Sequence, residues 1–151
     1  MPLTFNDILT RYRTHSFSER DKGDRFERLM QAYLKTDPTY ANKFKHVWLW
    51  NEFPGKLDLG AGDTGIDLVA LTHEGEYWAI QCKFFKKGTR IDKPAVDSFL
   101  STSSREFKNE EMQTTRFAQR LWISTTNNWG ANATQAIKNQ NPPVNRINLI
   151  D

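Results

Sequence analysis

A carboxylate, an amide and an ammonium group stand at the ends of two short apolar segments. Asp67 comes near the start of the segment 66–71, after a glycine-rich stretch. Gln81 and Lys83 close the segment that begins at residue 77. Both segments are rich in β-branched and aromatic residues, which predicts the two strands of a hairpin. Polar groups at the ends of such strands have little structural purpose, so Asp67, Gln81 and Lys83 form a candidate catalytic site.

These groups suit metal-dependent hydrolysis of a phosphodiester. A phosphodiester is protected by its own negative charge, so cleavage requires a cation on the phosphate and an activated water. Magnesium prefers oxygen ligands, typically one or two carboxylates with water and substrate oxygens. Asp67 can supply a carboxylate, and the backbone carbonyl of Cys82 is a second candidate ligand. Lys83 is expected to orient or deprotonate the attacking water, or to hold the phosphate.

A second carboxylate, if the site needs one, would have to come from another element, and Glu27 is the candidate. The pattern predicts a helix over about residues 19–35 with an apolar stripe at helical spacing. The stripe consists of Phe26, Leu29, Met30, Tyr33 and Leu34. At about 100° per residue, Glu27 falls at the border of the stripe and not on the outer face. The alternative is a solvated or salt-bridged glutamate.

The catalytic interpretation imposes a condition on the hairpin. If Glu74 and Gly75 formed a simple two-residue turn, Asp67 would face Cys82, and Gln81 and Lys83 would point to the opposite side of the sheet. An odd loop length or a β-bulge would align Asp67 with Gln81 or Lys83. We therefore predict a loop of three or five residues, or a bulge near the strand ends. A regular two-residue hairpin would exclude the site.

The rest of the chain predicts an α/β fold. The expected order is helix, helix, three strands, helix, strand, helix, strand. The further elements are a helix at 4–14, a strand within 43–53, a helix from near Pro94 with Phe107 on its inner face, a loop at 108–115, a strand at 116–125, a helix at 131–139 and a strand at 145–150. Three successive strands favour a meander, and the later alternation favours parallel crossovers. The expected result is a mixed sheet with helices on both faces.

The bulk properties suit a single cytoplasmic domain spanning residues 1–151. A chain of 151 residues can bury roughly 68–70% of its unfolded surface. Cys82 is the only cysteine, so no intrachain disulfide can form and a reducing compartment is expected. No apolar run approaches the ~18 residues of a membrane span, and no signal peptide is evident, so we expect no membrane partner.

Positive charge offers a weaker indication of the substrate. The formal net charge is +3 and the isoelectric point is about 9.0, which is compatible with nucleic acid. Lys86, Lys87 and Arg90 form a basic stretch directly after the proposed lysine. Such a stretch is usually solvated surface, and here contact with DNA phosphates is an equally good interpretation.

At these residues the sequence resembles a known group of nucleases. Asp67 followed fourteen positions later by Gln81-Cys82-Lys83 resembles the PD-(D/E)xK nuclease superfamily in its Mrr-like branch. The stretches 18–27, 48–52, 63–69 and 123–126 also look like the N-terminal nuclease module of type ISP restriction–modification enzymes. The resemblance runs from about Phe5 to Ile150. Ile66 stands where the superfamily has its proline, and Gln81 replaces an acid.

The resemblance implies further properties. It implies the core topology αβββαβ, dependence on Mg²⁺ with Mn²⁺ as a substitute, and a role for Glu27 as the helical glutamate. It implies hydrolysis of duplex DNA by a domain that precedes a helicase-like ATPase and a methyltransferase in one prokaryotic chain. The isolated domain is expected to be monomeric.

Two alternatives to a DNA endonuclease remain open. Because Gln81 removes one charged metal ligand, the chain could be a nucleic-acid-binding module that keeps the fold without cleaving. A resolvase or an RNA-directed nuclease on the same fold is the other alternative, and branched DNA or structured RNA would separate these substrates.

Overall fold

The computed structural model describes residues 7–8, 10–11, 19–59, 65–85 and 89–148. Five strands form one mixed sheet in the order β1-β2-β3-β6-β7. The strands are β1 (Phe44–Leu49), β2 (Leu68–Thr72), β3 (Tyr77–Lys83), β6 (Phe117–Ser124) and β7 (Val144–Asn148). The helices are α2 (Glu19–Thr36), α3 (Pro38–Ala41), α4 (Lys56–Leu59), α5 (Lys93–Ser103) and α6 (Ala131–Ile137).

The sheet combines a meander with parallel crossovers. The pairs β1–β2 and β2–β3 are antiparallel, whereas β3–β6 and β6–β7 are parallel. A parallel neighbour requires a connection that returns to the starting edge, and α5 and α6 lie in the two connections. The predicted α/β fold, with its meander and its crossovers, is confirmed.

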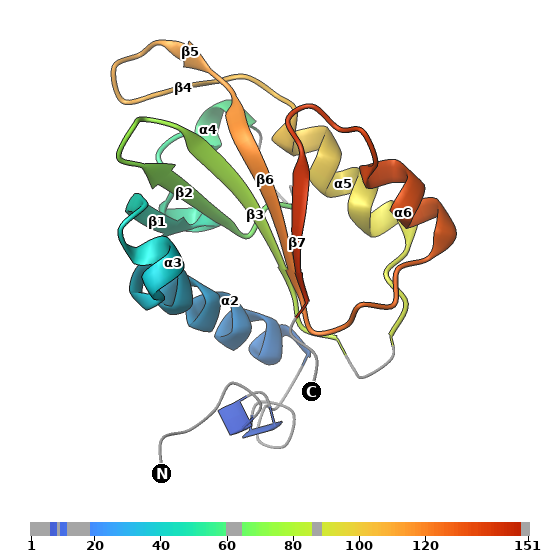
Figure 1. Ribbon diagram of the computed structural model, residues 1–151. Helices are drawn as coiled ribbons and strands as arrows, with labels where there is room; N and C mark the ends of the chain where they lie inside the picture. The colour runs from blue at the N-terminus through green and yellow to red at the C-terminus, as the bar shows by residue number, and fades with distance from the viewer. Residues whose placement is uncertain (1–6, 9, 12–18, 60–64, 86–88, 149–151) are drawn as a thin grey trace.

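Helices cover both faces of the sheet (Figure 1). On one face, Phe26, Met30 and Leu34 of α2 pack in the same buried cluster as Leu68 and Ile80. These three residues belong to the predicted helical stripe, and the two others in it are partly buried against the same cluster. The stripe therefore forms because its spacing places one helix face on the sheet.

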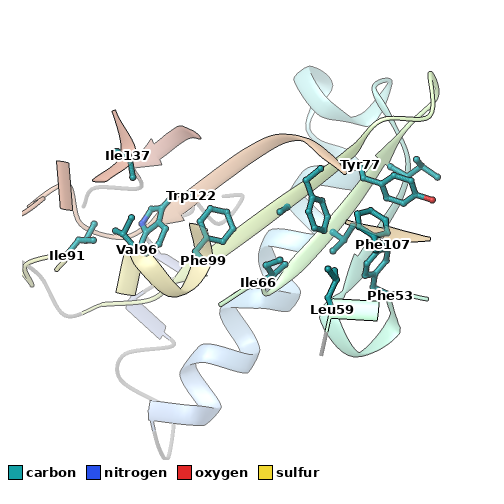
Figure 2. Close-up of a cluster of buried hydrophobic side chains, with 14 of the residues drawn as sticks. Phe53, Leu59, Ile66, Tyr77, Ile91, Val96, Phe99, Phe107, Trp122 and Ile137 are labelled. Carbon is teal, nitrogen blue, oxygen red and sulfur yellow. The ribbon is translucent and has the colours of Figure 1, made fainter. Parts of the chain in front are cut away.

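The other face carries a larger core. It includes Val96 and Phe99 of α5, Trp122 of β6, and Ala133 and Ile137 of α6 (Figure 2). An aromatic group extends this core toward the small hairpin described below, through Phe53, Tyr77, Phe107 and Phe117. Alternate residues of β3 divide between the two cores, since side chains along a strand point to opposite faces.

The β2–β3 connection is a three-residue loop, as one of the predicted options required. Leu68 faces Ile80 and Leu71 faces Tyr77 in the antiparallel register. The Thr72 N–H donates to the carbonyl of Glu76 at 2.8 Å, which leaves 73–75 as the loop. Gly75 has φ +92°, a left-handed conformation that glycine adopts without steric cost. The odd loop length sets the register on which the site depends.

Several predicted boundaries require correction. The strand expected within 43–53 ends at Leu49 and continues as a short 3-10 helix, Trp50–Glu52. The stretch 108–115 is not simply a loop, because β4 (Phe107–Lys108) pairs with β5 (Thr114–Thr115). Such two-residue strands are too short to show an alternating pattern.

Phe107 was wrongly expected on the inner face of α5. The helix ends at Ser103, and Phe107 lies in β4, where its ring packs 4.8 Å from that of Phe117. Phe107 follows Phe99 and Ser103 at helical spacing, but this agreement is a coincidence. Phe107 is buried in the same core as Phe99, although it belongs to a different element.

Both ends of the chain lie partly outside the described residues. Within the helix expected at 4–14, the described residues 7–8 and 10–11 are helical. The end of the last predicted strand, at 149–150, is not described. Among the helices in the described part, none is long and apolar enough to cross a membrane.

Candidate active site

The register of the hairpin brings Asp67 next to Gln81. Because Leu68 faces Ile80, the preceding pair in the same register is Asp67 and Gln81. The Asp67 N–H donates to the carbonyl of Ile80 at 2.9 Å, which continues the ladder beyond β2. Opposed residues point to the same face, and so do residues two apart in one strand. Asp67, Gln81 and Lys83 therefore project from one face of the sheet.

Asp67 is anchored by the neighbouring strand. The Cys82 N–H donates to its Oδ2 at 2.9 Å. A charge-assisted hydrogen bond from a backbone N–H fixes the orientation of the carboxylate. The carbonyl of Cys82 points to the same side of β3 as its N–H, because both groups of one residue share a direction in a strand. This carbonyl is therefore directed toward the strand that carries Asp67.

Gln81 is the unusual member of the group. Its side chain is buried, with 2% of its surface exposed, and its Oε1 has no hydrogen-bond partner within the described part of the chain. A buried polar atom without a partner is costly, and a functional role or a bound ion is a common explanation. An amide oxygen beside the Asp67 carboxylate is a chemically suitable ligand for a hard cation.

Glu27 approaches the same region from the helix on the other face. The ring of its neighbour Phe26 lies 5.3 Å from that of Phe84, which directly follows Lys83, so this turn of α2 is level with the end of β3. Burial raises the pKa of Glu27 from 4.5 to about 8. The negative charges of Asp67 and Asp24 raise this pKa further, and the Lys83 ammonium opposes the shift.

The charges of Asp67 and Lys83 act on the pKa of Glu27, which places the three side chains near one another. Two carboxylates held close together in a partly buried site repel each other, so the site favours either a proton or a cation between them. Asp24 was not singled out by the sequence pattern. Its position three residues before Glu27 is the signal that could have drawn attention to it.

Cys82 has no nucleophilic role in this arrangement. Burial raises the pKa of its thiol well above the usual value, and the charges of Asp67 and Glu27 act in the same direction. A thiol in such surroundings stays protonated, and only the thiolate is a strong nucleophile. The chain's free cysteine is a buried core residue near the end of β3.

Two threonines of the β6 end fix the chain where it leaves β3. The Phe85 N–H donates to Thr125 Oγ1 at 2.8 Å, and this hydroxyl donates to the Phe85 carbonyl at 3.0 Å. Thr126 Oγ1 donates to the carbonyl of Thr89 at 3.0 Å. Both threonines are buried. They hold the backbone next to Lys83, a role that their place in the sequence did not reveal.

The proposed DNA-contacting residues are only partly described. Lys86 and Lys87 lie outside the described residues, whereas Arg90 is exposed. No group of three or more histidine, cysteine, aspartate and glutamate side chains suited to a metal occurs in the described part. The donors available near Asp67 are therefore oxygens of mixed kind: two carboxylates, one amide and one backbone carbonyl. Such donors suit Mg²⁺ or Mn²⁺ better than zinc.

Comparison with known families decides the class. The model of the Mrr_cat_2 family, described as restriction endonuclease, matches residues 35–151. The chain belongs to this family. The matched range includes Asp67, Gln81 and Lys83 of this chain, and it begins after Glu27. Membership in a restriction endonuclease family establishes the nuclease class of the domain and agrees with the Mrr-like resemblance.

A solved structure supports the same assignment over a longer span. The chain is similar to part of the ATP-dependent Type ISP restriction-modification enzyme LlaBIII bound to DNA, with 29% sequence identity and a TM-score of 0.70. The similarity covers 98% of the present chain and 8% of the LlaBIII chain. The chain thus spans only a small part of the length of that enzyme. No protein among the curated sequences matches.

Proposed function

We propose that this chain is a Mg²⁺-dependent endonuclease domain that hydrolyses phosphodiester bonds of duplex DNA. The observation that carries the proposal is the buried Oε1 of Gln81, which has no partner among the described residues and stands beside Asp67 in the register of the hairpin. The raised pKa of Glu27 supports it. Burial is the largest cause of the shift, and the nearby negative charges of Asp67 and Asp24, which a cation would offset, raise this pKa further.

The residues present fit a magnesium ion. Asp67, the Gln81 side-chain oxygen and the Cys82 carbonyl would hold it, with Glu27 as a further carboxylate. When bound, magnesium polarises the phosphate and lowers the pKa of a coordinated water. Lys83 extends from the same face as Asp67, and its ammonium group would hold the phosphate or position the attacking water. Thr125 keeps the backbone beside Lys83 in place.

The proposal includes a larger enzyme as the natural context. The structural relative is an ATP-dependent enzyme bound to DNA, and the chain is similar to only 8% of it. We propose that a helicase-like ATPase and a methyltransferase act together with this domain in a cytoplasmic prokaryotic protein. Target recognition and translocation would then belong to those parts. The domain would supply the hydrolytic step.

Cleavage of plasmid DNA tests the activity. Supercoiled plasmid is incubated with wild type, Asp67→Ala or Lys83→Ala in the presence of Mg²⁺ or Mn²⁺, and nicked and linear products are quantified. Wild type is expected to cleave, and each substitution is expected to reduce the rate at least a hundredfold. Lys138→Ala is the control, because Lys138 is exposed just beyond the end of α6.

The results separate the competing functions. Cleavage that survives both Asp67→Ala and Lys83→Ala would show that the site lies elsewhere. A wild type that binds duplex DNA but leaves it intact with either metal would instead support a non-cleaving binding module. Preferential cleavage of branched DNA or structured RNA in parallel reactions would reassign the substrate.

A further inference from the structure

The register of the sheet extends the candidate site across two more strands. Gln81 of β3 is paired with Trp122 of β6, and Trp122 is paired with Arg146 of β7. Paired residues of parallel strands point to the same face. A single row of the sheet therefore contains Asp67, Gln81, Trp122 and Arg146, with Arg146 at the outer strand.

Arg146 is exposed and held in place by an aromatic side chain. Its guanidinium carbon lies 5.0 Å from the centre of the Trp129 ring, a cation–π geometry. The Trp129 ring lies in turn 5.3 Å from that of the buried Trp122. Within the described part of the chain, no carboxylate pairs with Arg146. Its charge is oriented by packing and is available to a ligand.

A second arginine reaches the same segment. An ideal Cβ on Gly130 would lie 3.4 Å from Cδ of Arg90, so the Arg90 side chain lies against this glycine. Gly130 directly follows Trp129, and a bridge between Ile91 and Trp129 ties the two stretches together. Arg90 lies against Gly130 and Arg146 lies over Trp129, and these two supporting residues are adjacent in the connection between β6 and α6. The two exposed arginines give this end of the sheet a positive edge.

We propose that Arg146 binds a backbone phosphate of duplex DNA next to the position of cleavage. This inference rests on the proposed function. Strands in a sheet are about 4.8 Å apart, which places Arg146 roughly 10 Å from Gln81 across the sheet. One DNA strand carries a phosphate about every 3.4 Å along the helix axis, so the contacted phosphate lies within roughly three nucleotides of the cleaved one. A preoriented guanidinium suits the bidentate recognition of phosphate oxygens.

Salt-dependent binding provides the test. Binding of the 151-residue chain to a fluorescently labelled DNA duplex is measured by anisotropy over a series of salt concentrations, without divalent cations so that no cleavage occurs. Log K falls linearly with log salt, and each neutralised phosphate adds about 0.9 to the magnitude of this negative slope. Arg146→Gln is expected to weaken binding and to reduce the magnitude of the slope by about 0.9. Arg146→Lys is expected to retain the slope, because it keeps the charge.

Lys45→Gln is the matched control. It removes one positive charge from an exposed residue in β1, close to Thr72 and His73 at the opposite end of the sheet. Its slope is expected to equal that of wild type. Thermal unfolding of each variant shows whether it is folded, which separates a lost phosphate contact from lost Trp129 packing.

Three outcomes of the comparison between variants would overturn the inference. They are an unchanged slope in Arg146→Gln, an equal reduction in Lys45→Gln, or a failure of Arg146→Lys to retain the slope. The absence of any binding by wild type would also overturn it. The plasmid assay judges the proposed function separately, because cleavage by wild type with an unchanged Arg146→Gln slope would reject only the role of Arg146.

Discussion

At the scale of single residues, the site combines a few charged side chains with one neutral amide oxygen, that of Gln81. Asp67 is anchored by the Cys82 N–H, and Glu27 stays protonated near neutral pH because it is partly buried and faces other carboxylates. Gln81 adds an oxygen without adding charge. In the proposed metal site, the small number of charged ligands would limit the affinity for a cation, and protonation of Glu27 would oppose metal binding.

Converting the amide to a carboxylate should strengthen metal binding. Gln81→Glu places a further negative charge beside Asp67, and we expect the affinity for Mn²⁺ to rise by about tenfold, since ligand charge sets the affinity of such sites. Calorimetric titration with Mn²⁺ measures this change. Gln113→Glu makes the same chemical substitution at an exposed residue of the small hairpin and is expected to leave the affinity unchanged. Equal affinities in all three proteins would argue against Gln81 as a ligand.

The protonation of Glu27 predicts a pH-dependent stability. Its pKa is about 8 in the folded protein and 4.5 ordinarily, so between these values the folded protein retains a proton that the unfolded chain loses. This group therefore makes the free energy of unfolding fall as the pH rises through that window. Glu27→Gln should be more stable than wild type above about pH 8 and equally stable near about pH 4.

Urea denaturation in the absence of divalent metal measures this difference. Asp67→Asn is a second comparison, because it removes a charge that raises the pKa of Glu27 and should narrow the window. A stability difference between Glu27→Gln and wild type that is constant over the whole pH range would contradict the assignment.

At the scale of elements, two glycines hold the hairpin in its register. Gly75 has φ +92° in the three-residue loop and has open space around it. Gly65 has φ +73° two residues before Asp67, and a Cβ there would lie 2.8 Å from the backbone nitrogen of Phe99 in α5. The first glycine serves only the turn, whereas the second also allows the chain to pass close to a helix.

The pair Gly65→Ala and Gly75→Ala should separate these effects. Gly75→Ala is expected to cost about 1–2 kcal/mol, the penalty of a left-handed conformation alone. Gly65→Ala should cost about 3 kcal/mol or more, because the conformational penalty adds to a clash with helix backbone that cannot easily move. Urea denaturation provides both values. Similar losses in the two variants would mean that the approach of Gly65 to α5 is not tight.

At the scale of the whole molecule, a buried arginine links the second half of the sheet to its helices. Arg120 of β6 is 1% exposed. Its guanidinium donates to the Pro142 carbonyl at 2.7 Å and to Gln140 Oε1 at 2.9 Å, beyond α6. It also donates to the hydroxyls of Ser103 and Ser104 at the end of α5. Arg120 thus ties three separate parts of the fold together.

Arg120→Ala should be among the most destabilising changes outside the site. It removes several charge-assisted hydrogen bonds and leaves a cavity, so a loss of about 3–5 kcal/mol is expected in urea denaturation. Arg116→Ala is the matched control. Arg116 forms an exposed ion pair with Glu106 at 2.6 Å, which should contribute less than about 1 kcal/mol. Equal losses would show that Arg120 has no special structural role.

Much of the fold follows from local patterns in the chain. The helical stripe that begins at Phe26 determines which face of α2 is buried, and the order of helices and strands favours the meander and the crossovers. The small β4–β5 hairpin and the placement of Phe107 escaped prediction. Their elements are too short to carry a periodic signal, and burial alone does not reveal which element supplies a buried ring.

The sequence by itself determined which groups could do chemistry, because Asp67, Gln81 and Lys83 are polar residues at the ends of apolar strands. The sequence left open whether Asp67 lies on the same face of the sheet as Gln81 and Lys83 or on the opposite face. Only the tertiary structure decided this, since a loop of three residues aligns Asp67 with Gln81 and a loop of two would separate them. The approach of Glu27 and the row that reaches Arg146 also depend on contacts between distant segments, and no local pattern specifies such contacts.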